Sequence, residues 1–485
     1  MNPIATTDLL RLYPEGFLLF SLCALLLVDL FIVDRHRAVT HWLAVSLLAL
    51  TALLVWRLGG NETLRGGAFG GMFLVDGIAT LCKLFILLAS ALVLIYAKPY
   101  LLPRKLFKGE FHTLTLFAVL GMMLLVSAGN LLIAYLGLEL LALPLYALVA
   151  LDRDSGRATE AAMKYFVLGA LASGMLLFGM SLLYGASGSL DLGSIRAAAV
   201  SNSPHPWLYG IAVVFIVIGI AFKLGAVPFH MWIPDVYHGA PTAVTVFIAS
   251  APKIAGFGLA YRLLDGALDP FARDWASMLA VLALLSLVVG NVVAIAQTNF
   301  KRMLAYSTIS HVGFLLLGFI AHTPDGYGSA LFYAVTYALT STAAFGLIIL
   351  LSRSGFEAEE IADFSGLNQR NPWYALLMLL VMASFAGVPL MVGFLAKLQV
   401  LKAIIGANLI WLAVAAGVLA VVGAYYYLRV IKVMYFDAPG QANALALPRD
   451  LPFRLVLSLN ALALLGLGVL GGPLLSWCLR VTAGG

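Results

Sequence analysis

Five lysines lie within long apolar stretches of this 485-residue sequence, where charged side chains are rare. Burying an ammonium group at the centre of a membrane helix costs about 2.5–3.5 kcal/mol on insertion scales, so each of these lysines needs an explanation. An amine held between burial and a nearby carboxylate can release and accept a proton when its partner moves. The pattern indicates an ion path, and the five residues are Lys83, Lys164, Lys223, Lys253 and Lys397.

Glu139 is the carboxylate best placed to exchange protons with these amines. It is the only acidic residue deep within the apolar stretches of the central part of the chain, roughly 15 Å into its helix at 1.5 Å per residue. We interpret it as a proton carrier, with Lys223 and Lys253 as relay lysines and Lys397 as their counterpart further along the chain. The alternatives are a fixed ion pair for Glu139 and, for Lys164 above all, a side chain that extends to the membrane surface.

Three histidines are weaker candidates for the same path. His311 lies within an apolar stretch and, because histidine titrates near neutral pH, could link two parts of a relay. A histidine that is simply hydrogen-bonded is the alternative. His230 and His238 flank a polar connection that contains Asp235, and they could gate proton entry, although loop histidines are commonly structural.

Two acidic residues near the N-terminus fall outside this pattern. Asp76 and Lys83 are seven residues apart, which places them on one face of a helix and predicts an ion pair between them. Asp29 has no evident partner in the sequence, and contact with another subunit is one explanation for it.

The sequence contains no motif of a redox or nucleotide-binding site. No GxGxxG fingerprint follows a strand, no P-loop is present, and no histidine pair has haem or copper spacing. The three cysteines lack CxxC spacing and are expected to be small core residues: Cys23, Cys82 and Cys478. Basic residues are not interleaved with aromatic ones as in nucleic-acid-binding surfaces. We expect no cofactor, no metal ion and no nucleic acid on this chain.

The composition places these residues in an integral membrane protein. Apolar residues make up 62% of the sequence and charged residues only 11%, against roughly half and a quarter in soluble domains. Fourteen stretches approach or exceed the length needed to cross a hydrocarbon core of about 30 Å, which predicts an all-α fold of about 14 transmembrane helices. The first stretch begins near Gly16 and is typical of a mature span, not of a cleaved signal peptide.

The predicted spans lie near residues 16–33, 40–56, 71–96, 111–128, 130–150, 160–184, 207–228, 241–264, 275–297, 302–321, 327–352, 373–401, 408–436 and 455–479. Loops after odd-numbered spans carry most of the loop lysines and arginines. The positive-inside rule therefore puts those loops in the cytoplasm and both termini outside it.

Two of these spans contain a proline that interrupts the helix. Gly225-Ala226-Val227-Pro228 ends the seventh span, and Ala386-Gly387-Val388-Pro389 lies within the twelfth. Each break falls in the fourth helix of a five-helix unit, and two consecutive units with an odd number of helices are inverted relative to each other. Coincidence is the alternative, since prolines are common in membrane helices. The predicted parts are a three-helix segment (1–110), two inverted five-helix repeats (111–264 and 275–437) and a C-terminal helix (438–485).

Two motifs within these units resemble a known family. The stretch Phe222–Pro241 reads FKLGAVPFHMWIPDVYHGAP, and the stretch Gln297–Gly313 reads QTNFKRMLAYSTISHVG. Both are similar to the antiporter-like membrane subunits of bacterial complex I, the proton-pumping NADH:quinone oxidoreductase. The Pro-Asp-Val-Tyr portion is most similar to the subunit N group, whose members lack the long lateral helix of larger homologues. The likeness covers nearly the whole chain.

The resemblance implies a subunit of a bacterial plasma-membrane complex that couples electron transfer from NADH to quinone to proton export. Other membrane subunits would be its partners, and the whole complex would use NADH and quinone. By motif position, Glu139 would be the acid of the first unit, Lys223 and Lys253 its relay lysines, and Lys397 the terminal lysine of the second unit. Lys164 also fits the subunit N pattern, whereas the resemblance assigns no role to Lys83.

Two other functions stay open at this point. A subunit of a multi-subunit cation/proton antiporter would share the broken helices and the lysines but would lack redox coupling. The Pro-Asp-Val-Tyr stretch favours complex I over that alternative. A purely structural membrane spacer would make the buried lysines dispensable.

Overall fold

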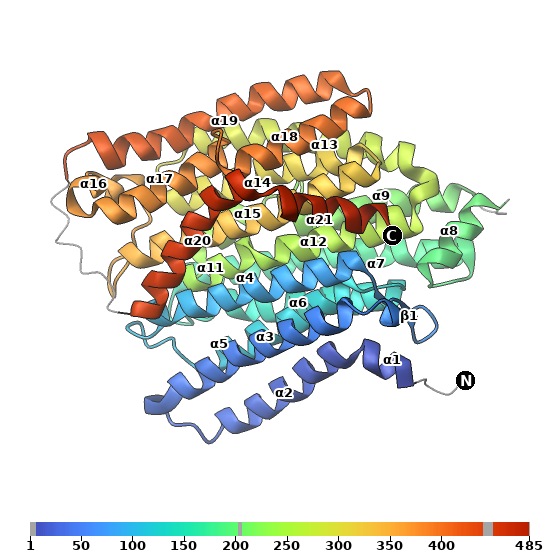
Figure 1. The fold of residues 1–485 in the computed structure, drawn as a ribbon, viewed down its shortest axis with the longest axis horizontal. Coiled ribbons are helices and arrows are strands. Elements are labelled where there is room, and N and C mark those ends of the chain that lie inside the picture. Colours follow the sequence, from blue (N-terminus) through green and yellow to red (C-terminus); the bar gives the residue numbers. More distant parts are fainter. Residues whose placement is uncertain (1–5, 202–205, 440–449, 485) are drawn as a thin grey trace.

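The protein is a bundle of long helices that run side by side along one direction (Figure 1). The computed structural model describes residues 6–201, 206–439 and 450–484. Within these residues, twelve helices are long and apolar enough to cross a membrane. A two-stranded hairpin is the one sheet in the described part of the chain. The expected all-α membrane fold is confirmed.

The N-terminal part comprises a short helix, the hairpin and three long helices. Its elements are α1 (Thr6–Arg11), α2 (Tyr13–Asp29), η1 (Asp34–His36), α3 (Arg37–Gly59), η2 (Glu62–Leu64), β1 (Gly66–Ala68), β2 (Phe73–Val75) and α4 (Gly77–Leu101).

The middle of the chain continues with α5 (Gly109–Val126), α6 (Leu131–Val149), α7 (Gly156–Ser187), α8 (Leu192–Val200), α9 (Pro206–Leu224), α10 (Trp232–Gly239), α11 (Thr242–Ala249), α12 (Ala251–Tyr261), the π-helical turn η3 (Arg262–Ala267) and η4 (Asp269–Phe271).

The remaining elements are α13 (Ala272–Ala296), α14 (Phe300–Ile320), α15 (Pro324–Leu351), η5 (Ile361–Phe364), α16 (Leu367–Arg370), α17 (Pro372–Ala386), α18 (Val392–Gly406), α19 (Ile410–Phe436), α20 (Leu451–Leu470) and α21 (Gly472–Ala483).

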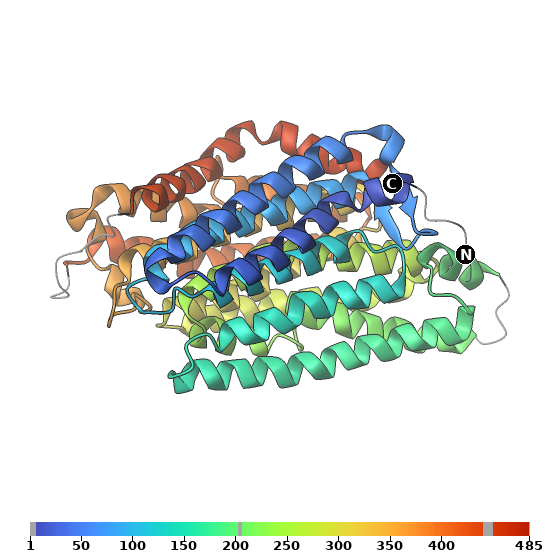
Figure 2. The same cartoon turned by 90° about the horizontal axis from the view of Figure 1, so that it is seen from below.

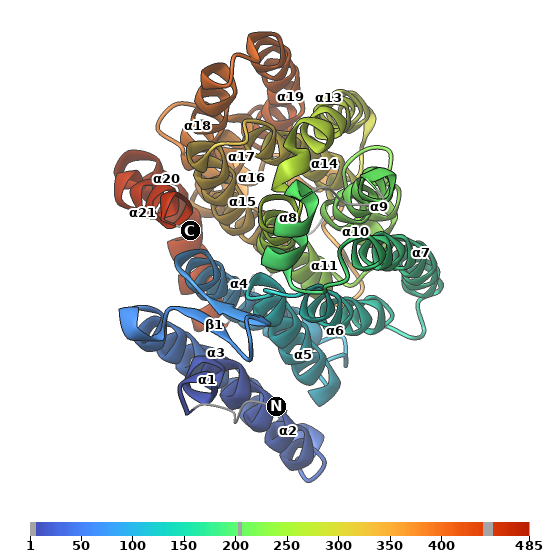
Figure 3. The ribbon, with the colours of Figure 1, turned by 90° about the vertical axis from the view of Figure 1, so that its right-hand side faces the viewer.

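Viewed along the helices, α15 and α11 lie in the interior of the bundle, with α2 and α3 at one edge and α19 at the opposite edge (Figure 3). The most apolar window of α15 is completely buried, whereas only a third of that of α3 is buried. The hairpin and the last helix, α21, lie at the same end of the bundle as α1 (Figure 2). We call this the hairpin end and the other the opposite end.

Twelve of the fourteen predicted spans coincide with the long apolar helices of the described chain. The first predicted span is α2, which has only 17 residues. The twelfth is divided into α17 and α18. The last predicted span, 455–479, is also two helices, because α20 ends at Leu470 and α21 begins at Gly472.

The two predicted helix breaks are confirmed. The helix α9 ends at Leu224, and α17 ends at Ala386. In both cases the next residue is a glycine with positive φ, +88° at Gly225 and +84° at Gly387, a conformation that favours glycine. A third break was not predicted: Ser250, with φ −116° and ψ −95°, separates α11 from α12.

Glycines let the first two helices of each predicted five-helix unit pack closely. A Cβ atom at Gly121 in α5 would lie 2.5 Å from the backbone nitrogen of Leu141 in α6, and one at Gly137 in α6 would lie 2.8 Å from the nitrogen of Leu125. Further along the chain, a Cβ at Gly290 in α13 would lie 2.6 Å from the nitrogen of Ser310 in α14. Small residues at such crossings are typical of membrane helices, whose association depends on close packing.

The expected ion pair between Asp76 and Lys83 is wrong. Lys83 Nζ lies 2.7 Å from Glu15 of α2, and both side chains are almost fully buried. Asp76 instead binds Arg262, at 2.6 Å, at the start of the π-helical turn. Residues one or two turns apart on a helix share a face, but a neighbouring helix can offer a closer partner, as it does twice here.

Asp29 also has partners within the chain. Its carboxylate lies 2.5 Å from Arg37 and accepts a hydrogen bond from Thr40 at 2.7 Å, so no other subunit is needed to explain it. Cys82 and Cys478 are buried as expected, whereas Cys23 is exposed.

Replacing Gly121 by alanine is expected to destabilise the fold by about 1–3 kcal/mol, because the new methyl group would force α5 and α6 apart. The measurement is thermal unfolding of the detergent-solubilised protein, followed by tryptophan fluorescence. Gly174→Ala is the matched control, since nothing lies within 4 Å of a Cβ at Gly174 in α7. Equal unfolding temperatures for the two variants would contradict the packing argument.

Candidate functional site

Glu139 and Lys223 face one small cavity between α6, α7 and α9. The cavity has a volume of about 20 Å³, and its lining also includes Tyr146, Tyr165 and Trp232. That volume is enough for about one water molecule. Glu139 Oε1 is buried and has no hydrogen-bond partner among the described residues. The two groups therefore share a cavity and do not form the direct ion pair that we considered, although each lies within the electrostatic reach of the other.

Lys253 binds the end of the first broken helix. Its Nζ donates a hydrogen bond of 2.8 Å to the carbonyl of Leu224, the last residue of α9, and the side chain is 3% exposed. The break at Ser250 starts a new helix two residues before Lys253. An ammonium group is favourable at a helix C-terminus, where carbonyl groups lack partners in the helix. Lys253 is also close enough to Lys223 for the two charges to repel each other.

Lys397 makes the corresponding contact in the second broken helix. Its Nζ donates to the carbonyls of Phe385 and Ala386, at 2.8 and 3.1 Å, where α17 ends. Lys253 and Lys397 thus occupy equivalent chemical positions, but they reach them from different elements. Lys253 comes from the span after its broken helix, whereas Lys397 comes from the second half of the broken helix itself.

His311 lies between two tyrosines in the second unit. Its Nδ1 is 2.6 Å from the hydroxyl of Tyr333, and its Nε2 is 3.1 Å from the hydroxyl of Tyr427. Tyr427 is also hydrogen-bonded to Ser307, and its hydroxyl lies 3.3 Å from that of Tyr426. A cavity of about 10 Å³ beside His311 is lined by Phe385, whose carbonyl binds Lys397. The histidine therefore joins a buried chain of hydroxyl groups to the neighbourhood of that lysine.

Lys164 lies outside these buried clusters. Its side chain is 46% exposed, and its Nζ lies 2.8 Å from Glu160 and 2.9 Å from Asp235. Asp235 also binds Arg302 of α14, at 3.1 Å. This arrangement agrees with the alternative that the Lys164 side chain extends to the membrane surface, and it does not place Lys164 beside Glu139. His230 lies in the connection between α9 and α10, where its Nδ1 is buried and has no hydrogen-bond partner among the described residues.

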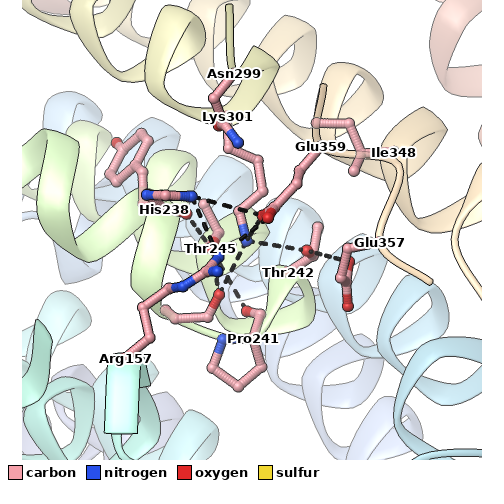
Figure 4. Close-up of polar contacts among 12 residues, drawn as sticks. Arg157, His238, Pro241, Thr242, Thr245, Asn299, Lys301, Ile348, Glu357 and Glu359 are labelled. Carbon is pink, nitrogen blue, oxygen red and sulfur yellow. Dashed lines mark hydrogen bonds and ion pairs between the residues drawn. The ribbon is translucent and has the colours of Figure 1, made fainter. Parts of the chain in front are cut away.

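Charged residues from α7, α10, α14 and the segment after α15 line one polar cavity (Figure 4). We call five of them the terminal charge cluster: Arg157, His238, Lys301, Glu357 and Glu359. The cavity has a volume of about 320 Å³. Tyr100 and Arg104, near the far end of α4 from the hairpin, line the same cavity, so the cluster lies at the opposite end of the bundle.

Glu359 is the centre of the terminal charge cluster. Its carboxylate lies 3.0 Å from Arg157, 3.8 Å from His238 and 4.0 Å from Lys301. Burial alone would raise the pKa of Glu359, but the interaction with His238, the charge of Lys301 and the hydrogen bond from Arg157 outweigh it and lower the pKa to about 2. The carboxylate therefore stays ionised at any physiological pH.

Lys301 connects this cluster to the interior. Its side chain is 2% exposed, and its Nζ donates to the carbonyl of Ala240 at 3.1 Å and to the hydroxyl of Thr242 at 3.3 Å. Thr242 in turn donates to Glu357 at 3.2 Å (Figure 4). Thr242 begins α11, which leads to Ser250 and Lys253. The cluster thus borders the polypeptide segment that carries Lys253, one of the predicted relay lysines.

One group of residues in the described chain has the composition of a metal site. Asp265, Asp269 and His322 place potential ligand atoms within 4.8 Å of one another at the hairpin end. Asp269 already binds Arg196 at 2.6 Å and His322 at 3.0 Å. Two of the three residues therefore already have partners within the chain.

Several of these residues were not predicted to be functional. Lys301 directly precedes the tenth predicted span and has the sequence position of a loop lysine, although its side chain is buried. Tyr333 and Tyr337, one turn apart on α15, lie in a span that also carries Thr336 and Thr340. Such a hydroxyl-bearing stripe in an apolar span was the available signal. Glu357 and Glu359 gave none, because their positions depend on how the loop after α15 folds back.

The chain matches known proteins over most of its length. Residues 128–423 match the family model described as NADH:quinone oxidoreductase/Mrp antiporter, TM. The protein named NADH-quinone oxidoreductase subunit N from Thioalkalivibrio sulfidiphilus (strain HL-EbGR7) is 52% identical over 97% of each chain. The protein of the same name from Xanthomonas euvesicatoria pv. vesicatoria (strain 85-10) is 53% identical over 100% of this chain and 98% of its own.

Solved structures agree with these relatives. A chain of respiratory complex I from Thermus thermophilus with bound aureothin superimposes with a TM-score of 0.81 at 33% identity, covering 96% of this chain and 98% of its own. A chain of the Mrp complex from Dietzia sp. DQ12-45-1b has the same TM-score at 20% identity over 99% and 97%, which shows a shared fold alone. From the family model and its half-identical relatives, the chain belongs to the NADH-quinone oxidoreductase subunit N family.

Proposed function

We propose that this chain translocates protons across the bacterial plasma membrane as a subunit of an NADH:quinone oxidoreductase. The complex as a whole would use NADH and quinone, and this chain would contribute the proton path. The observation that carries the proposal is that Lys253 and Lys397, each buried in a span, bind the free carbonyls at the two helix breaks. Family membership supports the redox coupling, and the other membrane subunits would be its partners.

In the first unit, Glu139 and Lys223 would exchange a proton through the cavity that they share. The cavity holds about one water, which can bridge a carboxyl and an amine that are not in direct contact. A charge gained or lost at Lys223 acts on Lys253, because the two amines repel each other. Lys253 is hydrogen-bonded to the carbonyl of Leu224, the residue next to Lys223. The two lysines are therefore linked both by their charges and through the backbone at the end of α9.

In the second unit, His311 and its tyrosines would carry the proton toward or away from Lys397. An imidazole can accept a proton at one nitrogen while it donates from the other, and both nitrogens of His311 face a tyrosine hydroxyl. Phe385 lies between His311 and Lys397: its ring centroid is 5.2 Å from that of His311, and its carbonyl binds Lys397. A change of protonation along this chain of hydroxyl groups would therefore occur close to Lys397.

The terminal charge cluster would admit protons from the cytoplasm. The positive-inside rule puts the loops at this end of the bundle in the cytoplasm and both termini on the periplasmic side. The cavity is polar and large enough for several waters, and His238 lies within it beside Glu359. His238 would exchange protons with these waters, while the permanently charged Glu359 holds the surrounding cations. His230 and Lys164 remain candidate accessory groups at the first break and beside Asp235.

The proposal includes the internal repeats and favours complex I over the antiporter alternative. The corresponding helix breaks and glycine crossings support two inverted five-helix repeats at 111–264 and 275–437. The antiporter alternative without redox coupling rests on a shared fold at 20% identity, whereas the subunit N relatives are about half identical.

The relay proposal predicts that Lys223→Ala abolishes most NADH-driven proton pumping while the complex still assembles. The reason is that Glu139 would lose the only amine lining its cavity. The measurement is pumping in membrane vesicles, with assembly checked by native gel electrophoresis. Lys402→Ala is the matched control, since Lys402 is an exposed lysine of α18. Normal pumping by an assembled Lys223→Ala complex would refute the relay.

The tyrosine chain predicts a loss of coupled turnover when Tyr333 and Tyr427 are both replaced by phenylalanine. His311 would lose both hydroxyl partners, and NADH:quinone turnover should fall by about tenfold or more, as for other proton-transfer groups. Tyr425→Phe is the control, because Tyr425 is 57% exposed on the same helix as Tyr427. If the double variant turns over as fast as the control, His311 does not act through these hydroxyls.

The pKa of Glu359 predicts how its contribution to stability depends on pH. A carboxyl group whose pKa is lowered in the folded state stabilises the fold fully above its unfolded pKa, and that contribution is lost as the pH falls toward about 2. In a His238→Gln background, which removes the neighbouring imidazole, the unfolding temperatures with and without Glu359→Gln should therefore differ by a constant amount between about pH 5.5 and pH 8.5.

Glu110→Gln is the control for that experiment. Glu110 makes an ion pair with Arg153 at 3.5 Å, but both side chains are largely exposed, so its removal should change stability little. In the His238→Gln background, a difference that varied across this pH range would mean that Glu359 itself titrates there. It would then not be the permanent charge of the cluster.

A further inference from the structure

A fourth cavity, larger than the three described above, lies at the hairpin end. It has a volume of about 770 Å³ and is bounded by the end of α3, the start of α4, and α21. The three helices are in direct contact beside it. A Cβ at Gly59 of α3 would lie 2.5 Å from Thr80 of α4, and one at Gly77 of α4 would lie 2.8 Å from Val481 of α21. The walls of the cavity are therefore built from packed helices.

Three arginines line this cavity: Arg57, Arg65 and Arg480. Neither Arg57 nor Arg65 makes a side-chain hydrogen bond or an ion pair with the residues that the structure describes. Arg480 donates one hydrogen bond, of 3.3 Å, to the carbonyl of Ser476. Glu62 precedes Arg65 in the same loop, but it does not line the cavity. Three positive charges thus surround one cavity without an acidic partner in the described chain.

The rest of the lining is apolar and aromatic. Trp56 and Trp477 meet edge to face, with ring centroids 6.0 Å apart, and Leu474 and Val481 continue the apolar wall. Tryptophan side chains concentrate where membrane spans meet the aqueous phase. Trp56 and Arg57 are close to the end of α3, and Trp477 and Arg480 are close to the end of the chain's last helix. The cavity therefore combines a cationic part with an apolar part at one membrane surface.

We propose that this cavity binds the headgroup of an anionic phospholipid. The phosphate would lie among the three guanidinium groups, and the acyl chains would follow the apolar wall formed by Trp56, Leu474 and Trp477. Guanidinium groups recognise phosphate through paired, charge-assisted hydrogen bonds. Basic pockets between membrane helices are suited to acidic lipid headgroups.

The surroundings favour a lipid over a neighbouring protein subunit as the occupant. A protein partner would need to bring acidic side chains to three arginines and also an apolar segment to the two tryptophans. One phospholipid molecule has both an anionic and an apolar part. This site is independent of the proton path, because the relay lysines lie elsewhere in the bundle.

The test is photocrosslinking in the assembled complex. The purified complex would be placed in phosphatidylcholine vesicles that contain a minor fraction of photoactivatable phosphatidylglycerol, and labelled peptides would be located by mass spectrometry. We expect labelling of peptides from residues 53–65 and 473–483, several-fold stronger than with photoactivatable phosphatidylcholine. Replacing Arg57, Arg65 and Arg480 by glutamine should reduce labelling by about fivefold for each arginine lost.

Arg273→Gln is the matched control, because Arg273 is an exposed arginine at the hairpin end that does not line the cavity. It should leave the labelling unchanged. Equal labelling by the two lipids in the wild-type complex would overturn the proposal, and this comparison needs no variant to fold. Undiminished labelling in an assembled triple-glutamine complex would overturn it as well. Labelling confined to a different subunit seated over these peptides would identify a protein interface instead.

Discussion

A backbone carbonyl that cannot find a partner in a membrane is the constraint on which this structure depends. Within the hydrocarbon layer, each unpaired backbone group is costly, so a helix can be interrupted only where something replaces its missing hydrogen bonds. At both breaks that replacement is a lysine, Lys253 for α9 and Lys397 for α17. The same contact explains how an ammonium group is tolerated in a span, since the carbonyls offer it a partner. The break and the buried charge stabilise each other.

The rest of the site follows from this pairing. The break in α9 directs the chain into α10, which brings Trp232 to the cavity of Glu139 and Asp235 to Lys164 and Arg302. The interruption at Ser250 then positions Lys253. Close helix crossings at Gly121 and Gly290 hold the surrounding helices at short range. The buried charged groups are tolerated in this apolar bundle because they supply hydrogen bonds to the backbone at the helix breaks.

Features that depend on local chain chemistry were predictable from the sequence, whereas those that depend on distant contacts were not. The breaks at Gly225 and Gly387 followed from glycine and proline within apolar runs, and the lysines from the cost of burying charge. Pairing between helices did not follow. Lys83 binds Glu15 of α2, although Asp76 caps the same helix that carries Lys83. The loop that carries Glu359 has no periodicity from which its approach to Arg157 could be derived.

The buried pair between Glu15 and Lys83 also bears on how the chain is assembled. Glu15 precedes Lys83 by 68 residues, so it leaves the ribosome well before its partner exists. A lone carboxylate is poorly accommodated among lipid chains, and α2 is short and lies at the edge of the bundle. The helix α2 can reach its final position in the bundle only after α4 has been inserted. The ion pair that holds α2 in the bundle can therefore form only after α4 has been synthesised.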